Sequence, residues 1–155
     1  MRPKHFTLVS VSTTSAAGLL LRYADGEQFA LDLVEIIERH PTLARLKNRD
    51  VFATAQLGDH GASVVWAEDD DLELAADNLR ARAVEQAGGI SHEFIWNWMA
   101  RHHLTLDTAA EALGVSRRML AYYRSGAKPL PRTVALACLG WEDVIKNNGR
   151  FALAA

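Results

Sequence analysis

The stretch TLDTAAEALGVSRRMLAYYRSG (Thr105–Gly126) decides the fold of the second half of this chain. An alanine pair at 109–110 precedes Gly114, and small side chains suit the steep crossing of two short helices. Gly114 tolerates the positive φ of a tight turn, and the hydroxyl of Ser116 provides an N-cap for a following helix. The pattern therefore predicts two short helices joined by a tight turn, the second covering about residues 117–125.

The second of these helices has an inward and an outward side, because an α-helix repeats every 3.6 residues. We expect Leu120 and Tyr123 to pack inward, together with Leu113 and Val115. The residues expected to face outward are Ser116, Arg117, Arg118, Ala121, Tyr122 and Ser125.

Residues 91–148 resemble the lambda-repressor-like (Xre-type) DNA-binding family. The family pattern of alanine, glycine, an apolar residue, serine, a recognition helix and then a glycine followed by a proline is matched by Ala110, Gly114, Val115, Ser116, Leu120, Gly126 and Pro129. Many members carry glutamine at the start of the first motif helix, where this chain has Leu106. The resemblance implies an all-α helix-turn-helix domain that binds double-stranded DNA as a transcriptional regulator.

Two classes of DNA contact follow from this resemblance. Arg117 and Arg118 lie in the first turn of the expected recognition helix, where arginine can bind guanine through two hydrogen bonds, although adjacent arginines are often a solvated face. Phosphate contacts are expected from Thr105, Arg124 and Lys128. The expected DNA-binding set is Thr105, Ser116, Arg117, Arg118, Ala121, Tyr122, Arg124, Ser125 and Lys128. One half-site specifies few base pairs, so we expect a homodimer on a palindrome.

The formal charge of −2 is divided unevenly along the 155 residues. Residues 1–89 carry nine Lys/Arg and fourteen Asp/Glu, whereas residues 90–155 carry eight and five. Positive charge thus gathers in the half that contains the helix pair, as a phosphate-binding surface requires. The change occurs at Gly88-Gly89, which predicts two domains at residues 1–88 and 89–155.

The first domain is predicted to be α+β, with a small antiparallel sheet and helices packed on one of its faces. Alternating apolar residues and turn signals predict strands at 6–11, 19–23, 29–33, 51–57 and 62–67, with hairpin turns at 25–26 and 58–61. Helical spacing predicts a helix at 34–40 with Val34 and Ile37 facing inward, and it leaves undecided whether Ile36 also faces inward. A second helix at about 75–86 is expected to bury Leu79 and Ala83.

This half is similar to the domain-of-unknown-function 2442 family. The matching residues are Tyr23, Asp25, Gly26, Glu27, Leu31, Asp32, Leu33, Phe52, Trp66 and Asp69 to Asp71. The resemblance implies a regulatory setting without chemistry, in which the domain dimerises or senses a ligand or a protein partner. The alternative function for the whole chain is an antitoxin-like protein-interaction module that does not bind DNA.

Residues that carry chemistry do not form a catalytic pattern. Neither a Gly-x-Ser-x-Gly elbow nor a phosphate-binding glycine loop nor a Rossmann fingerprint occurs, so we expect no enzyme activity. The histidines show no metal-ligand spacing, and His102-His103 are interpreted as complementing a helix C-terminus, so no metal or cofactor is expected. The run Glu68 to Asp71 is interpreted as an acidic turn before a helix rather than a cation site.

The single cysteine, two tryptophans and the N-terminal segment give expectations about burial and cellular location. Cys138, the single cysteine, lies among apolar neighbours and is expected to be a buried thiol. Trp96 and Trp98 are two residues apart on a predicted helix, so only one can face the core, and the other marks an interface or is a lone surface aromatic. Polar residues interrupt any apolar run near the N-terminus, which predicts neither a signal peptide nor a membrane span and favours a cytoplasmic location.

Overall fold

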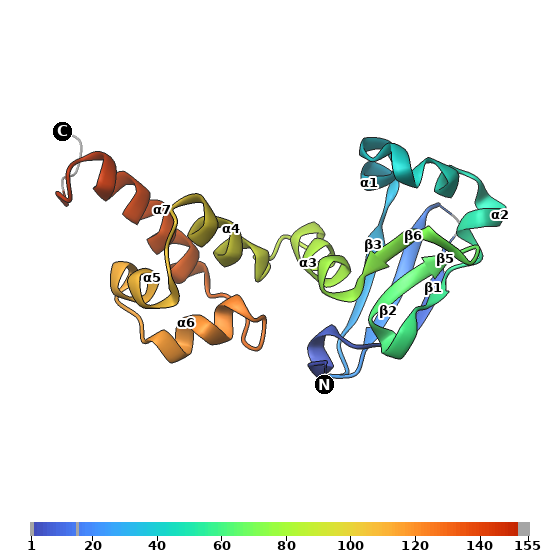
Figure 1. Ribbon diagram of the computed structural model, residues 1–155, viewed down its shortest axis with the longest axis horizontal. Coiled ribbons are helices and arrows are strands. Elements are labelled where there is room, and N and C mark those ends of the chain that lie inside the picture. The colour runs from blue at the N-terminus through green and yellow to red at the C-terminus, as the bar shows by residue number, and fades with distance from the viewer. Residues whose placement is uncertain (1, 15, 152–155) are drawn as a thin grey trace. The chain divides into compact units, whose positions relative to one another are not determined.

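A computed structural model describes residues 2–14 and 16–151 and divides the chain into two compact units, Met1–Gly89 and Ile90–Ala155. The first is an α+β unit with antiparallel strands and the second is helical, so the predicted fold class is confirmed (Figure 1). No helix within the described residues is long and apolar enough to cross a membrane.

The α+β unit contains two three-stranded antiparallel sheets, with strand orders β1-β2-β3 and β4-β5-β6, whereas the sequence suggested a single sheet. Its elements are, in order, η1 (Lys4–Phe6), β1 (Leu8–Thr13), β2 (Gly18–Tyr23), β3 (Gln28–Asp32), α1 (Val34–Arg39), η2 (Pro41–Lys47), α2 (Arg49–Phe52), β4 (Gln56–Leu57), η3 (Asp59–Gly61), β5 (Ser63–Trp66), β6 (Asp69–Ala75) and α3 (Ala76–Gln86).

The first sheet follows the alternation in the sequence. Leu19, Leu21 and Tyr23 of β2 are buried on one face, while the intervening Leu20 is half exposed. The hairpin between β2 and β3 turns at Gly26, whose φ of 92° is a conformation that glycine adopts without steric strain. In helix α1 the expected inward position of Val34 is wrong, because Val34 is 43% exposed. Ile36 and Ile37 are the buried residues of this helix.

The strand expected at 51–57 is wrong, because the short helix α2 occupies its first part and only Gln56–Leu57 forms a strand. Asn48 caps α2 by accepting hydrogen bonds from the backbone N–H groups of Asp50 (2.8 Å) and Val51 (3.3 Å). The carbonyl of Phe52 then accepts a hydrogen bond from the indole of Trp66, which is fully buried. A local cap and a contact across the core thus outweigh the strand propensity of Val51 and Phe52.

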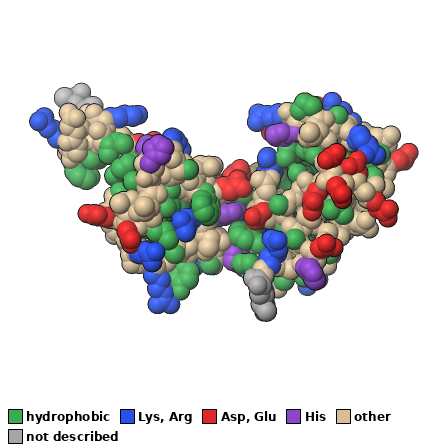
Figure 2. Space-filling model, viewed as in Figure 1, with side chains coloured by type: hydrophobic (Ala, Val, Ile, Leu, Met, Phe, Trp, Pro, Cys, Tyr) green, Lys and Arg blue, Asp and Glu red, His purple; other side chains and the backbone are tan. Residues whose placement is uncertain are grey.

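The acidic run Glu68 to Asp71 does not precede a helix directly, so its interpretation as a helix-favouring turn is wrong. Its aspartates begin the strand β6, which pairs with β5 in antiparallel register and buries Leu72. An edge strand can hold acidic side chains on its solvent-facing side, because only its other side packs against the core. Figure 2 shows acidic side chains gathered over this part of the unit.

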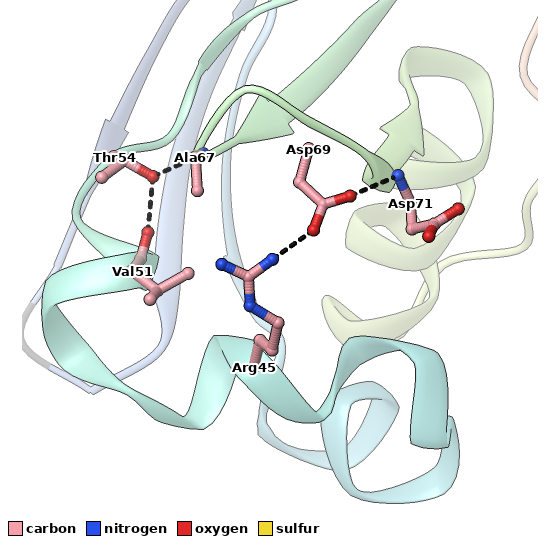
Figure 3. A network of polar contacts seen from close by, with 6 residues as sticks. All are labelled: Arg45, Val51, Thr54, Ala67, Asp69 and Asp71. Carbon is pink, nitrogen blue, oxygen red and sulfur yellow. Dashed lines mark hydrogen bonds and ion pairs between the residues drawn. The ribbon is translucent and has the colours of Figure 1, made fainter.

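The β5–β6 turn is strained and is held by contacts from elsewhere in the unit. Ala67 and Glu68 have φ angles of 55° and 52°, which costs a non-glycine residue about 1–2 kcal/mol. Thr54 Oγ1 accepts a hydrogen bond from the Ala67 N–H at 2.8 Å, and Arg45 forms an ion pair with Asp69 (Figure 3). These contacts fix the turn without the Asn-Gly pair that such turns favour.

Helix α3 covers the first sheet and confirms the expected burial of Leu79 and Ala83. Its Arg80 connects three segments of the unit. The guanidinium pairs with the Asp25 carboxylate (2.9 Å), donates to the His5 carbonyl (2.9 Å), and lies 5.0 Å from the centre of the Tyr23 ring. Burial opposes ionisation of Asp25, but hydrogen bonds from Arg80 and from a backbone N–H outweigh it and lower the pKa of the carboxyl.

The helical unit contains α4 (Glu93–Arg101), α5 (Leu106–Leu113), α6 (Arg117–Arg124) and α7 (Arg132–Lys146). Its core includes Ile95, Trp98, Met99, Ala109, Ala110, Leu120, Leu130, Val134, Ala135 and Cys138. Cys138 is fully buried as expected, and burial raises the pKa of its thiol to about 12.

His102 connects the end of α4 to α7. Its Nε2 donates a hydrogen bond to Glu142 Oε1 at 2.8 Å, and its ring lies 5.0 Å from that of Trp141. The hydrogen bond lowers the pKa of the Glu142 carboxyl. Charge and packing together therefore fix the orientation of α7 against α4.

Candidate nucleic-acid interface

The turn between α5 and α6 is fixed by local interactions at both helix ends. Thr105 and Thr108 cap α5 reciprocally, because each hydroxyl accepts a hydrogen bond from the backbone N–H of the other residue, at 3.1 and 2.8 Å. Gly114 ends α5 in the left-handed conformation with φ of 69°. Ser116 caps α6 by accepting from the Met119 N–H at 3.1 Å. Local contacts at both helix ends thus define the turn that places α6 relative to α5.

The inward side of α6 agrees with the expectation from helical spacing. Leu120 is fully buried, and Tyr123, Leu113 and Val115 are partly buried against the core of the unit. The helix ends at Arg124, one residue before the expected end. Since Leu120 fixes which side of the helix faces the core, the two arginines of the first turn project into solvent.

The expected DNA-binding residues divide into two groups by exposure. Exposed residues are Thr105, Ser116, Arg117, Arg118, Ser125 and Lys128, while Ala121, Tyr122 and Arg124 are partly buried. All of them except Thr105 belong to α6, to its two capping residues or, for Lys128, to the turn that follows the helix. Figure 2 shows basic side chains projecting from the part of the unit where Figure 1 places α6.

Tyr122 gathers two of the cations on one side of α6. Arg118 Nε donates a hydrogen bond to the Tyr122 hydroxyl at 2.9 Å, and Lys128 Nζ lies 4.8 Å from the centre of the Tyr122 ring. The aromatic ring attracts the ammonium group, and the arginine loses some of its freedom through the hydrogen bond. Two positive charges are therefore held close together on an exposed surface, as an anion-binding site requires.

Arg117 lies on another side of the helix and already has a partner. Its Nε contacts Asp107 Oδ1 at 3.0 Å, and the two side chains are 66% and 77% exposed. An ion pair this exposed stabilises the fold by at most about 1 kcal/mol, so an incoming anion can displace the carboxylate. Asp107 also lies in the first turn of α5, beside Thr105, where its charge opposes a phosphate.

Arg124 stacks over Trp96 of α4, with its guanidinium carbon 4.7 Å from the ring centre. Stacking covers the face of a guanidinium and leaves its N–H groups available in the plane, so Arg124 can still donate to a phosphate. Trp98 is 1% exposed and Trp96 is 50% exposed, which confirms that only one of the two faces the core. Trp96 and Asp107 were not in the expected site, and nothing in their spacing along the chain points to these partners.

The chain is similar over its full length to the putative DNA-binding protein NE0471 from Nitrosomonas europaea. The crystal structure of that protein superposes with a TM-score of 0.86 at 37% sequence identity, and the match covers 99% of this chain and 100% of the other. No protein-family model matches the chain, and a comparison with curated proteins also found no match.

Proposed function

This chain belongs to the same family as the Nitrosomonas europaea protein NE0471, and from this premise we propose that it binds double-stranded DNA. The contact surface is the outward side of α6, with α5 and α6 acting as a lambda-repressor-like helix-turn-helix. The observation that carries the proposal is the cluster of Arg118, Tyr122 and Lys128 on that side of the helix. We further propose that it acts in the cytoplasm as a transcriptional regulator through this DNA binding.

Different residues are proposed to contact the DNA backbone and the DNA bases. Lys128 follows the C-terminal end of α6, where an ammonium group suits a phosphate of the DNA backbone. Arg118 lies in the first turn of α6, which is the part of a recognition helix that enters the major groove. Arg117 contacts the same groove after its ion pair with Asp107 breaks. Breaking that pair costs little free energy, because both side chains are exposed to solvent.

For the α+β unit we propose a sensing role, in line with its likeness to the domain-of-unknown-function 2442 family. The support is a cleft of about 570 Å³ between the end of β1, α1, η2 and α2. Apolar side chains such as Ile37, Leu46 and Phe52 line it together with the charged Glu38, Lys47 and Arg49. A cleft of this size and mixed character suits a small ligand.

Binding to selected DNA at two salt concentrations tests the proposal. Duplexes that bind the wild type are first selected from a random pool. Fluorescence anisotropy then gives the affinity of each variant for the selected DNA. Lys128→Ala should weaken binding to all sequences alike and reduce the slope of log K against log salt by about one. Arg118→Ala should lose about 1–3 kcal/mol and relax the preference at one base position.

Arg39→Ala is the matched control, because it removes one exposed arginine from α1 in the other unit. It should leave affinity and salt slope close to those of the wild type. If the wild type shows no salt-dependent binding, or if all three variants behave alike, the proposal fails and the chain is better described as a protein-interaction module.

A further inference from the structure

The outward face of α7 carries two large apolar side chains that the helical unit does not cover. Leu136 is 52% exposed and Leu139 is 51% exposed, while Val134, Ala135 and Cys138 on the opposite face are buried. Exposed leucines are common singly, but these two are three residues apart and so adjoin on the helix surface. The exposed pair therefore forms one apolar patch at the middle of a 15-residue helix.

Opposite charges lie at the two ends of this patch. Arg132 precedes Leu136 by four residues, and Asp143 follows Leu139 by four residues. With 100° between successive residues, the four side chains fall within an arc of about 60°. Both charged residues are exposed, and neither has an ion-pair partner among the described residues. These four side chains form a stripe along α7 with a positive charge at one end, two apolar residues in the middle and a negative charge at the other end.

We propose that this stripe binds a second copy of the chain, with the two α7 helices antiparallel about a twofold axis. An axis midway between Leu136 and Leu139 brings Leu136 of each copy opposite Leu139 of the other. The same axis brings Arg132 of each copy opposite Asp143 of the other, so two ion pairs form at once. A twofold interface requires such a self-complementary order, whereas an unrelated partner does not.

Gly140 supports a close approach of another helix at this face. A glycine inside an exposed helix is less favourable than alanine by about 1 kcal/mol. A Cβ at Gly140 would meet no atom within 4 Å, so packing inside the chain does not require glycine there. Next to Leu136 on the helix surface, it lets a leucine from the second copy reach the backbone.

The proposed dimer leaves the surface of α6 free. Within the helical unit α7 packs against α4 and α5, and Figure 1 shows α6 along the opposite edge of the unit from the C-terminal end of α7. If the proposed function holds, the dimer presents two α6 helices to a palindromic site. The dimer itself rests on α7 alone and can be measured without DNA. A helix pair of about 22 Å is a small interface, so we expect a dissociation constant of about micromolar magnitude.

Sedimentation equilibrium of the full chain, from about 1 to 200 µM and without DNA, tests the proposal. The wild type should change from monomer to dimer across this range, and Leu136→Glu should stay monomeric. Leu20→Glu is the matched control, since Leu20 is 48% exposed on β2 of the other unit. It should dimerise like the wild type. Circular dichroism verifies that each variant is folded.

A charge exchange gives the sharper outcome. Arg132→Asp or Asp143→Arg alone places like charges opposite each other at both ends and should weaken the dimer at least about tenfold. The double variant restores opposite charges and should return the dissociation constant to within about threefold of the wild type. A monomeric wild type, dimerisation of Leu136→Glu, or failure of the double variant to recover would each overturn the proposal. DNA binding is measured separately, so a dimer without DNA affinity would refute the proposed function and leave this interface standing.

Discussion

Replacing Arg80 by alanine should destabilise the α+β unit strongly, because its side chain is only 16% exposed and joins α3 to two other segments. The change removes a charge-assisted hydrogen bond to Asp25 and another to the His5 carbonyl, each worth about 1.5–3 kcal/mol. It also removes the guanidinium from the rings of Tyr23 and Phe29, at about 0.5–1 kcal/mol each. Because these contributions overlap, we expect a loss of about 3–5 kcal/mol in the free energy of unfolding.

Urea titration followed by NMR separates this effect from any effect on the helical unit. The indole N–H of Trp66 reports on the α+β unit, and that of Trp98 reports on the helical unit. With an m-value of about 1.5 kcal/mol/M, the Trp66 transition of Arg80→Ala should fall by roughly 2–3 M, while the Trp98 transition stays in place. Arg39→Ala is the control, since its ion pair with Glu35 is exposed and worth at most about 0.5 kcal/mol.

The same variant makes a prediction about pH. The pKa of Asp25 is lowered in the folded unit, so its ionised form adds stability above the unfolded pKa of about 3.9, and that stability is lost as the pH falls through the folded pKa. The difference between wild type and Arg80→Ala should therefore be smaller at pH 3 than at pH 7. If Arg80→Ala shifts the transition no more than Arg39→Ala does, the argument from buried contacts is refuted.

Three other changes have expected outcomes. Gly61→Ala should abolish stable folding of the α+β unit in a thermal melt, because its Cβ would lie 2.1 Å from the Leu8 carbonyl oxygen at a φ of 70°; a melt within a few degrees of wild type would contradict this. Glu142→Gln should make the helical unit less sensitive to acid. The pKa of Glu142 is lowered in the folded unit, so its ionised form adds stability above the unfolded pKa of about 4.3, and that stability is lost as the pH falls through the folded pKa. An unchanged acid titration by circular dichroism would count against the role of His102. The two units expressed separately should each melt cooperatively, and failure of both would show that they need each other to fold.

The sequence alone was sufficient where short-range interactions decide the structure. Gly114 and Ser116 fix the α5–α6 turn by backbone conformation and capping, which involve only neighbouring residues. The inward position of Leu120 follows from helical periodicity, and the alternation in β2 follows from strand periodicity. These features were therefore readable without knowledge of the rest of the fold.

Contacts between distant residues decided what the sequence could not. Residues 49–52 form a helix because Asn48 caps it and because the buried Trp66 takes the Phe52 carbonyl as hydrogen-bond acceptor. The aspartates from Asp69 onward pair as a strand because β5 lies beside them. Their charge suggested a solvated turn, but an edge strand exposes one of its sides to solvent and accommodates that charge there.

The candidate interface combines both kinds of determination. Residue type and spacing placed Arg117, Arg118 and Lys128 on or beside α6, since a helix and its flanking turn are local structures. Their partners were set by the tertiary fold, which brings Asp107 to Arg117 and Trp96 to Arg124 across helix–helix contacts. Sequence thus determined which cations the surface offers, and only packing decided which of them are already paired, because pairing depends on distances between helices that periodicity does not specify.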